Sequence, residues 1–183
     1  MSRLEAIAKA SYYPTPPRVV DLIARAVQFT TPPEGSLLAV CAGGGDAAAQ
    51  LARAWNLASY GVELHTGRAV AAASKLMVCL HGSYHQLQAP EGSTSVLFLN
   101  PPYDEGFGTE RNIRQEVQFL EDAAKWLASD GLLVLVVPER ILDTDACSHI
   151  VRQNFRAVEV FRFPKPEYAA FKQHVVFAQK RDL

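Results

Sequence analysis

Short apolar runs of strand length alternate with segments of helical periodicity along the chain, and this alternation restricts the fold more than any other feature. The first five runs are almost entirely apolar, as is typical of parallel strands covered by helices on both faces. The seven predicted strands are Ser36–Cys41, Ser59–Glu63, Met77–His81, Ser95–Asn100, Leu132–Val137, Ala157–Phe163 and His174–Gln179.

Helical periodicity occupies the segments between these runs. In the segment that begins at Ile113, apolar residues recur at helical spacing, at Val117, Leu120, Ala124 and Leu127. The predicted helices are Arg18–Val27, Asp46–Trp55, Thr66–Leu76, Ile113–Ala128 and Asp145–Arg152. Alternating strands and helices predict an α/β fold, a doubly wound and mostly parallel seven-stranded sheet. The last two strands have no helix between them, so we expect them to form an antiparallel hairpin.

Length and composition narrow the classes of protein further. The chain has 183 residues, 49% of them hydrophobic, which predicts a single domain over residues 1–183 with no separate target-recognition domain. The net charge of −1 excludes a global positive field for nucleic acid, so any such charge must be local or come from a partner. The three cysteines are far apart and predict no disulfide framework. With no apolar leader or membrane-length run, we expect a cytoplasmic protein.

Three potential metal ligands, Cys79, His81 and His85, lie close together in the sequence. Alternate residues of one strand point to the same face but do not form a tetrahedral set, and no second cluster has ligand spacing. We therefore expect no metal site.

The most informative motif is Asn100-Pro101-Pro102-Tyr103, directly after an apolar strand. Ligands of open α/β sheets bind beyond the carboxyl ends of the strands, where this motif lies. The Asn100 side-chain oxygen and the Pro101 carbonyl can accept both hydrogens of a conjugated amine and direct its lone pair at a methyl sulfonium. The prolines make both acceptors rigid, and Tyr103 offers a ring on which an extruded base can stack. The alternative is a proline-rich turn with one exposed aromatic residue.

Two further features are typical of ligand binding at the same edge. The turn Cys41–Asp46 contains three consecutive glycines between a strand and a helix, which allows the backbone to approach a ligand closely. Glu63 ends the next strand about 20 residues later, a spacing that suits a carboxylate accepting ribose hydroxyls. The alternative for Glu63 is a solvated acid that caps the following helix.

The Asn100–Tyr103 motif resembles the catalytic motif of amino-methyltransferases, especially the adenine-N6 DNA methyltransferases. The similarity extends from YYPTPP at Tyr12 to FKQHVVFA at Phe171. It implies a class I, Rossmann-like methyltransferase with S-adenosyl-L-methionine as cofactor and a flipped adenine of DNA as the methyl acceptor. The residues expected to be catalytic are Asn100, Pro101, Pro102 and Tyr103. Those expected to contact the cofactor are Tyr13, Thr15, Cys41, Ala42, Gly43, Gly45, Glu63, Ser83 and Asn100.

For Tyr13 and Thr15 the resemblance implies packing over the methionine end of the cofactor. Thr15 has an alternative role as the cap of the helix that follows it.

The chain departs from this family at two acidic positions. Ala39 stands where an acid is expected to hold the ammonium group of the cofactor, and Val40 replaces the proline after it. Ser83 stands where an acid is expected near the cofactor's adenine, so a hydrogen bond there lacks charge assistance. These departures keep open a catalytically impaired member that binds nucleic acid or a partner.

More than one methyl acceptor fits the same motif. Release-factor glutamine methyltransferases also carry an Asn-Pro-Pro-Tyr loop, and a base in RNA is a further acceptor. Because little chain follows the last strand, we expect target recognition to come from a partner subunit, from a homodimer, or from a region of the protein outside this sequence. The cations that can contact phosphates near the active edge are Arg18, Arg111, Arg114 and Lys172.

Overall fold

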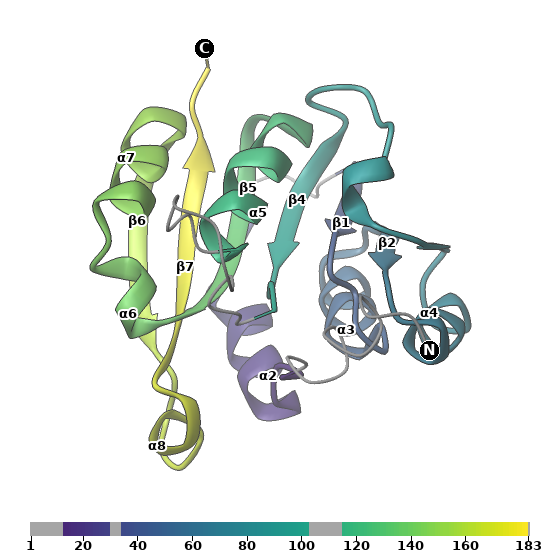
Figure 1. Ribbon diagram of the computed structural model, residues 1–183, viewed down its shortest axis with the longest axis horizontal. Helices are drawn as coiled ribbons and strands as arrows, with labels where there is room; N and C mark the ends of the chain where they lie inside the picture. Colours follow the sequence, from purple (N-terminus) through teal and green to yellow (C-terminus); the bar gives the residue numbers. More distant parts are fainter. Residues whose placement is uncertain (1–12, 30–33, 103–114, 183) are drawn as a thin grey trace, which may run out of the picture.

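A seven-stranded sheet forms the centre of the computed structural model, which describes residues 13–29, 34–102 and 115–182 (Figure 1). The strand order is β3-β2-β1-β4-β5-β7-β6. Strands β1 to β5 pair in parallel, whereas β7 is antiparallel to both β5 and β6. The predicted doubly wound sheet with its terminal hairpin is confirmed. The strands are β1 (Ser36–Ala39), β2 (Ala58–Glu63), β3 (Val78–His81), β4 (Thr94–Leu99), β5 (Leu127–Pro138), β6 (Phe155–Arg162) and β7 (Gln173–Lys180).

Helices cover both faces of this sheet, because successive strand residues point to opposite sides. Leu37 and Ala39 of β1 pack in one core with α2 (Pro17–Ala26), α3 (Asp46–Trp55) and the end of α4 (Thr66–Ala73). Leu38 packs in a second core with α5 (Gln115–Ala123) and α7 (Asp145–Asn154). The near-continuous apolar sequence of the inner strands follows from this burial on both faces.

The edge at β3 is less completely covered. Between β3 and β4 the chain forms only the short 3₁₀ helix η1 (Tyr84–Gln86). The side chains of Tyr60, Val78 and Leu80 are consequently exposed. Among the described residues, no helix has the length and apolar character needed to cross a membrane.

The predicted helix Ile113–Ala128 was wrong at its end. Helix α5 stops at Ala123, the 3₁₀ helix η2 (Ala124–Trp126) follows, and β5 already begins at Leu127. Leu127 pairs with Thr94 of β4 and is buried, so sheet pairing overrides the helical period there.

Two short helices were not predicted, α6 (Glu139–Leu142) after β5 and α8 (Glu167–Phe171) between β6 and β7. Each has about one turn, too few residues for a periodic pattern.

Parallel pairing brings the carboxyl ends of β1, β2 and β4 to one edge of the sheet. The start of α2 and the short helix α8 lie at the edge toward which β4 runs (Figure 1). This edge carries the cavity described next.

Candidate active site

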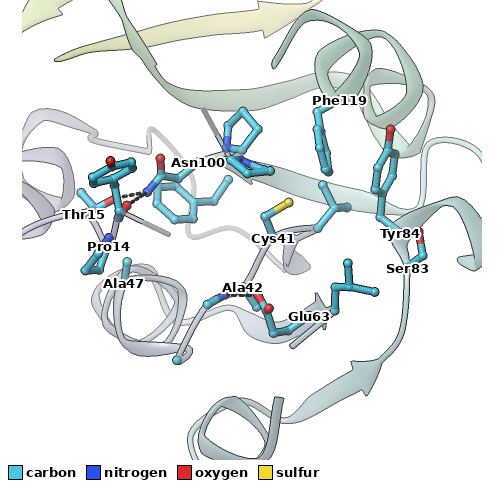
Figure 2. A pocket seen from close by; sticks show the side chains of 18 of the residues that line it. Pro14, Thr15, Cys41, Ala42, Ala47, Glu63, Ser83, Tyr84, Asn100 and Phe119 are labelled. Atoms are coloured by element: carbon cyan, nitrogen blue, oxygen red, sulfur yellow. Dashed lines mark hydrogen bonds between the residues drawn. The ribbon is translucent and has the colours of Figure 1, made fainter. Parts of the chain in front are cut away.

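A cavity of ≈ 390 Å³ opens at the carboxyl ends of β1, β2 and β4 (Figure 2). Its volume lies within the range of small-molecule sites. Its wall combines the segment before α2, the turn after β1, the ends of β2 and β3, the loop after β4, and one side of α5. The predicted site residues in this wall are Tyr13, Thr15, Cys41, Ala42, Gly43, Glu63, Ser83, Asn100, Pro101 and Pro102.

Two predicted residues stand apart from this set. Gly45 does not belong to the cavity wall but begins α3 in a left-handed conformation, with φ 81°. Tyr103, predicted to stack a base, lies outside the described residues, as do Arg111 and Arg114.

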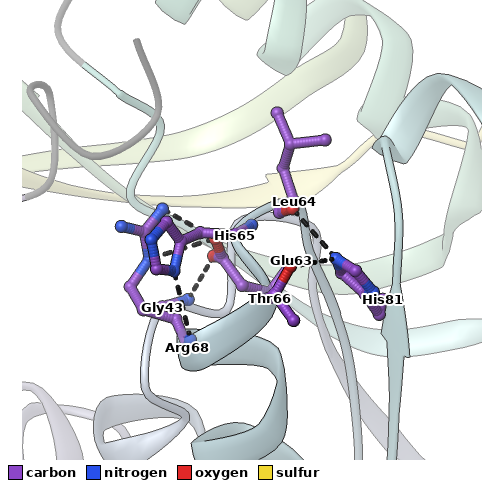
Figure 3. A network of polar contacts seen from close by, with 7 residues as sticks. All are labelled: Gly43, Glu63, Leu64, His65, Thr66, Arg68 and His81. Carbon is purple, nitrogen blue, oxygen red and sulfur yellow. Dashed lines mark hydrogen bonds and ion pairs between the residues drawn. The ribbon is translucent and has the colours of Figure 1, made fainter. Parts of the chain in front are cut away.

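Glu63 joins the glycine turn to the end of β2 and the start of α4 (Figure 3). Its Oε2 accepts a hydrogen bond from Gly43 N at 2.9 Å, and its Oε1 accepts one from His65 N at 2.8 Å. Oε1 also accepts from Arg68 Nε at 3.0 Å and Arg68 Nη2 at 2.7 Å. Glu63 is buried, so this ion pair is stronger than a surface pair.

The position of Arg68 changes what Glu63 can offer a ligand. Oε1 already accepts three hydrogen bonds, whereas Oε2 accepts one within this network. A carboxylate oxygen commonly accepts about two, so Oε1 is more than filled and Oε2 has room for one hydroxyl beside Gly43. Two hydroxyls require Arg68 to move. Sequence reasoning missed Arg68, although its place in the first turn after a strand-end acid was a usable signal.

Asp46 is the second carboxylate of the cavity wall, and it too is paired. Lys75 Nζ lies 2.8 Å from Asp46 Oδ2 and 2.8 Å from the carbonyl oxygen of Gly44. Lys75 therefore fastens the glycine turn to the end of α4. Both carboxylates of the described wall are thus paired with cations from the same region of the chain, Glu63 in a buried ion pair and Asp46 in an exposed one.

Asn100 extends from the end of β4 to the segment before α2. Its Nδ2 donates to the carbonyl oxygen of Tyr13 at 2.8 Å and to Thr15 Oγ1 at 3.1 Å. A carbonyl only accepts, so the amide nitrogen must face Tyr13, and this sets the orientation of the carboxamide. Thr15 is only 8% exposed, which partly shields the Asn100–Thr15 contact from water.

The alternative role of Thr15 as a helix cap was wrong. The cap position of α2 belongs to Pro16, with no side-chain hydrogen bond to the helix.

Aromatic rings form the end of the cavity opposite Asn100 (Figure 2). The rings of Tyr84 and Phe119 lie with their centroids 4.0 Å apart and their planes tilted by 30°. Tyr84 donates to Asp122 Oδ2 at 2.8 Å, and burial together with this bond raises the pKa of its hydroxyl. Ser83 lies in the wall beside them. The sequence offered no periodic signal for this pair, because it joins η1 to α5.

Cys41 lies between these two ends. Burial and the nearby Glu63 raise the pKa of its thiol well above the usual value, and Arg68 only partly opposes them. The thiol therefore stays protonated near neutral pH and contributes an apolar wall, not a nucleophile.

Ala39, where the family resemblance expects an acid, has 0% exposure and packs in the core with α2 and α3. It does not belong to the cavity wall.

Within the described ranges, no group of three or more His, Cys, Asp or Glu side chains is arranged to hold a metal ion. His81 instead contacts Thr66 Oγ1 at 3.3 Å and the Leu64 carbonyl oxygen at 3.2 Å.

The seven-stranded sheet of this order is the class I methyltransferase fold, which similar solved structures share. The Uncharacterised methyltransferase family (DUF6094) matches residues 1–183, so the chain belongs to this family. A search of curated proteins gives no match.

Three solved structures illustrate the likeness. One is assigned as a class I S-adenosylmethionine-dependent methyltransferase of Listeria monocytogenes (15% identity, TM-score 0.75, 92% of this chain and 61% of that one). Another is the type I restriction-modification methyltransferase subunit of Streptococcus thermophilus (14% identity, TM-score 0.74, 94% of this chain and 45% of that one). The third is the tRNA (m1A58) methyltransferase of Aquifex aeolicus (16% identity, TM-score 0.66, 100% of this chain and 77% of that one). This chain thus spans less than two thirds of the first two.

Gly45 offers a test of the turn that shapes the cavity. A Cβ at this position would lie 2.8 Å from Ala72 Cα, in a backbone conformation that L-residues rarely adopt. We expect Gly45→Ala to lower the free energy of unfolding by roughly 2–5 kcal/mol through strain and overpacking. Urea denaturation followed by circular dichroism measures the change.

Gly92→Ala is the matched control. Gly92 also has a positive φ, of 65°, but a Cβ at this position would have no neighbour nearer than 3.7 Å. The control should cost only about 1–2 kcal/mol, the conformational strain alone. Equal losses for both variants would contradict the packing of the turn against α4.

Proposed function

We propose that this protein transfers a methyl group from S-adenosyl-L-methionine to the exocyclic N6 amine of adenine in DNA. The observation that carries the proposal is the oriented Asn100 carboxamide at the end of β4. Asn100 is fixed by Tyr13 and Thr15 and is followed by two prolines at the cavity wall.

The residues of the cavity fit this cofactor. When bound, S-adenosyl-L-methionine supplies an electrophilic methyl group on a sulfonium centre. The Gly43 turn would lie against it, Glu63 Oε2 would accept one ribose hydroxyl, and Tyr84, Phe119 and Cys41 offer apolar contact for the nucleoside. The buried pair with Arg68 lowers the negative charge that Glu63 presents to the cofactor, whereas the Asp46–Lys75 pair is exposed and weaker.

The acceptor chemistry follows from the two prolines and Asn100. An amine conjugated to a purine is a poor nucleophile, because its lone pair is delocalised into the ring. The Asn100 oxygen and the Pro101 carbonyl would accept its two hydrogens and turn the lone pair toward the methyl group. A preorganised pair of acceptors needs no reorganisation during the reaction, which is the main advantage of such sites.

DNA as the substrate is supported by the Asn-Pro-Pro-Tyr motif and by the similar fold of a restriction-modification methyltransferase subunit. The similar fold of a tRNA methyltransferase favours a base in RNA as a second candidate acceptor. Ala39 and Ser83, which stand where the family has acids, and the buried pairing of Glu63 favour a third possibility, a member that binds nucleic acid or a partner subunit without catalysis. Binding of the cofactor separates this third possibility from the first two.

Cys41 reports on the cofactor site. Bound S-adenosylhomocysteine should cover its thiol and slow its alkylation by iodoacetamide several-fold, measured at a pH above the ordinary thiol pKa of about 8.5 because the pKa of Cys41 is raised. Cys79 is the internal control, because it is also partly exposed but does not line the cavity. Peptide mass spectrometry measures both rates. Unchanged alkylation of Cys41 under saturating ligand would contradict the proposed site.

Catalysis is tested by methyl transfer from labelled cofactor to adenine-containing duplex DNA, with the product identified as N6-methyladenine by mass spectrometry. Asn100→Ala removes one of the two acceptors and should lower kcat on the order of 100-fold. Thr15→Val removes one of the two contacts that orient Asn100, and should lower kcat by about tenfold or less, as for one neutral hydrogen bond. Cofactor affinity should change little in both.

Thr15→Ser is the matched control, because it keeps the hydroxyl and should retain most of the activity. If Thr15→Val loses cofactor affinity instead of kcat, Thr15 serves the cofactor and not Asn100. Methylation of RNA or of a protein glutamine in place of DNA would refute the substrate assignment. Failure to bind the cofactor would favour the non-catalytic member.

A further inference from the structure

The tip of the β6–β7 hairpin lies next to the start of α2, at the edge of the sheet that carries the cavity (Figure 1). Arg18 of α2 makes the connection: its Nη1 donates to the Lys165 carbonyl oxygen at 3.2 Å and lies 3.5 Å from Glu167 Oε2. Residues 147 positions apart are thus neighbours. Arg18 follows closely after Tyr13 and Thr15, which line the cavity.

Four exposed cations gather on this tip, which we call the hairpin surface: Arg18, Arg162, Lys165 and Lys172. The carboxylates in contact with the tip are already engaged. Glu139 Oε2 accepts from the Tyr168 hydroxyl at 2.9 Å, and the largely buried Glu167 pairs with Arg18. Four cations against these two carboxylates leave the hairpin surface locally positive, on a chain whose net charge is −1. At physiological salt a local cluster decides binding, since charges beyond about 8 Å are screened.

The geometry holds these cations in place. The Arg162 guanidinium lies 4.9 Å from the centroid of the Tyr168 ring, which orients it. Lys172 caps α8 in a left-handed conformation with φ 49°, a position that glycine usually occupies. Its N–H donates to the Tyr168 carbonyl oxygen at 2.8 Å, and its own carbonyl accepts from Glu139 N at 2.9 Å. The backbone is thus anchored on both sides while Lys172 as a residue is exposed.

We propose that the hairpin surface binds the phosphodiester backbone of the nucleic acid whose base enters the cavity. This inference rests on the proposed function, since it assigns a docking surface to the same substrate. Phosphate contacts position a nucleic acid without reading its sequence. A base extruded toward Asn100 must come from a strand that passes this edge of the sheet, where the hairpin surface meets it.

The experiment measures binding of a fluorescein-labelled 30-base-pair DNA duplex by fluorescence anisotropy over a series of salt concentrations. The test variant is the double substitution Lys165→Gln and Lys172→Gln. We expect its affinity at low salt to fall about tenfold or more, and the slope of log K against log salt to decrease by about 2, one for each lost phosphate contact.

The matched control is Arg53→Gln with Lys125→Gln, which also removes two exposed cations. Arg53 is at the end of α3 and Lys125 is in η2, just before β2 and β5 respectively, so both lie at the opposite edge of the sheet. The control should keep the wild-type affinity and slope. Equal losses in both pairs, or no binding of the duplex by the wild type at low salt, overturn the proposal.

Two parallel measurements separate this proposal from the proposed function. Calorimetry with S-adenosylhomocysteine should give the same affinity for wild type and both double variants. Selective loss of duplex binding in the hairpin variant supports the surface even if no methyl transfer is found. Methyl transfer that is unaffected in that variant overturns the surface and leaves the function intact. An RNA duplex with the same residue dependence supports a phosphodiester site, whereas binding to phosphatidylserine vesicles but to neither duplex overturns it.

Discussion

Parallel pairing of β1 with both β2 and β4 is the constraint on which the rest of the site depends. Parallel strands end at the same edge, so the glycine turn after β1, Glu63 after β2 and Asn100 after β4 meet although they are distant in the sequence. The hydrogen bond from Gly43 N to Glu63 Oε2 then joins two of these three ends directly. Asn100, after the third strand end, is held by hydrogen bonds to Tyr13 and Thr15, which line the same cavity.

The electrostatics of the cavity differ from those of a site that attracts a cation by charge. Asp46 is paired with Lys75, and Glu63 is paired with Arg68. Burial and Glu63 also keep Cys41 protonated. A ligand would therefore be held mainly by backbone groups, by apolar and aromatic surface, and by a hydrogen bond that Glu63 Oε2 accepts. Displacement of Arg68 would expose more of the Glu63 charge, at the cost of a buried ion pair.

The two edges of the sheet differ in what they offer the proposed nucleic-acid substrate. The carboxyl edge holds the cavity and the cations of the hairpin surface, whereas the control cations Arg53 and Lys125 lie at the other edge. The cations proposed to bind the nucleic-acid backbone thus lie at the same edge as the cavity, although the chain as a whole is slightly negative. The same fold places the oriented carboxamide of Asn100 and the proposed phosphate-binding cations at one edge of the sheet.

The sequence by itself determined the strands, most helices, the mixed sheet and the strand ends that carry the site, because apolar periodicity and turn residues are local signals. Only the tertiary structure decided where α5 ends and β5 begins, since Leu127 pairs with Thr94 of β4 in the sheet. It also decided that Arg68 neutralises Glu63, that Thr15 orients Asn100 instead of capping α2, and that Arg18 meets the hairpin tip. These contacts join side chains whose directions depend on how whole elements pack, and no periodicity within a single segment encodes them.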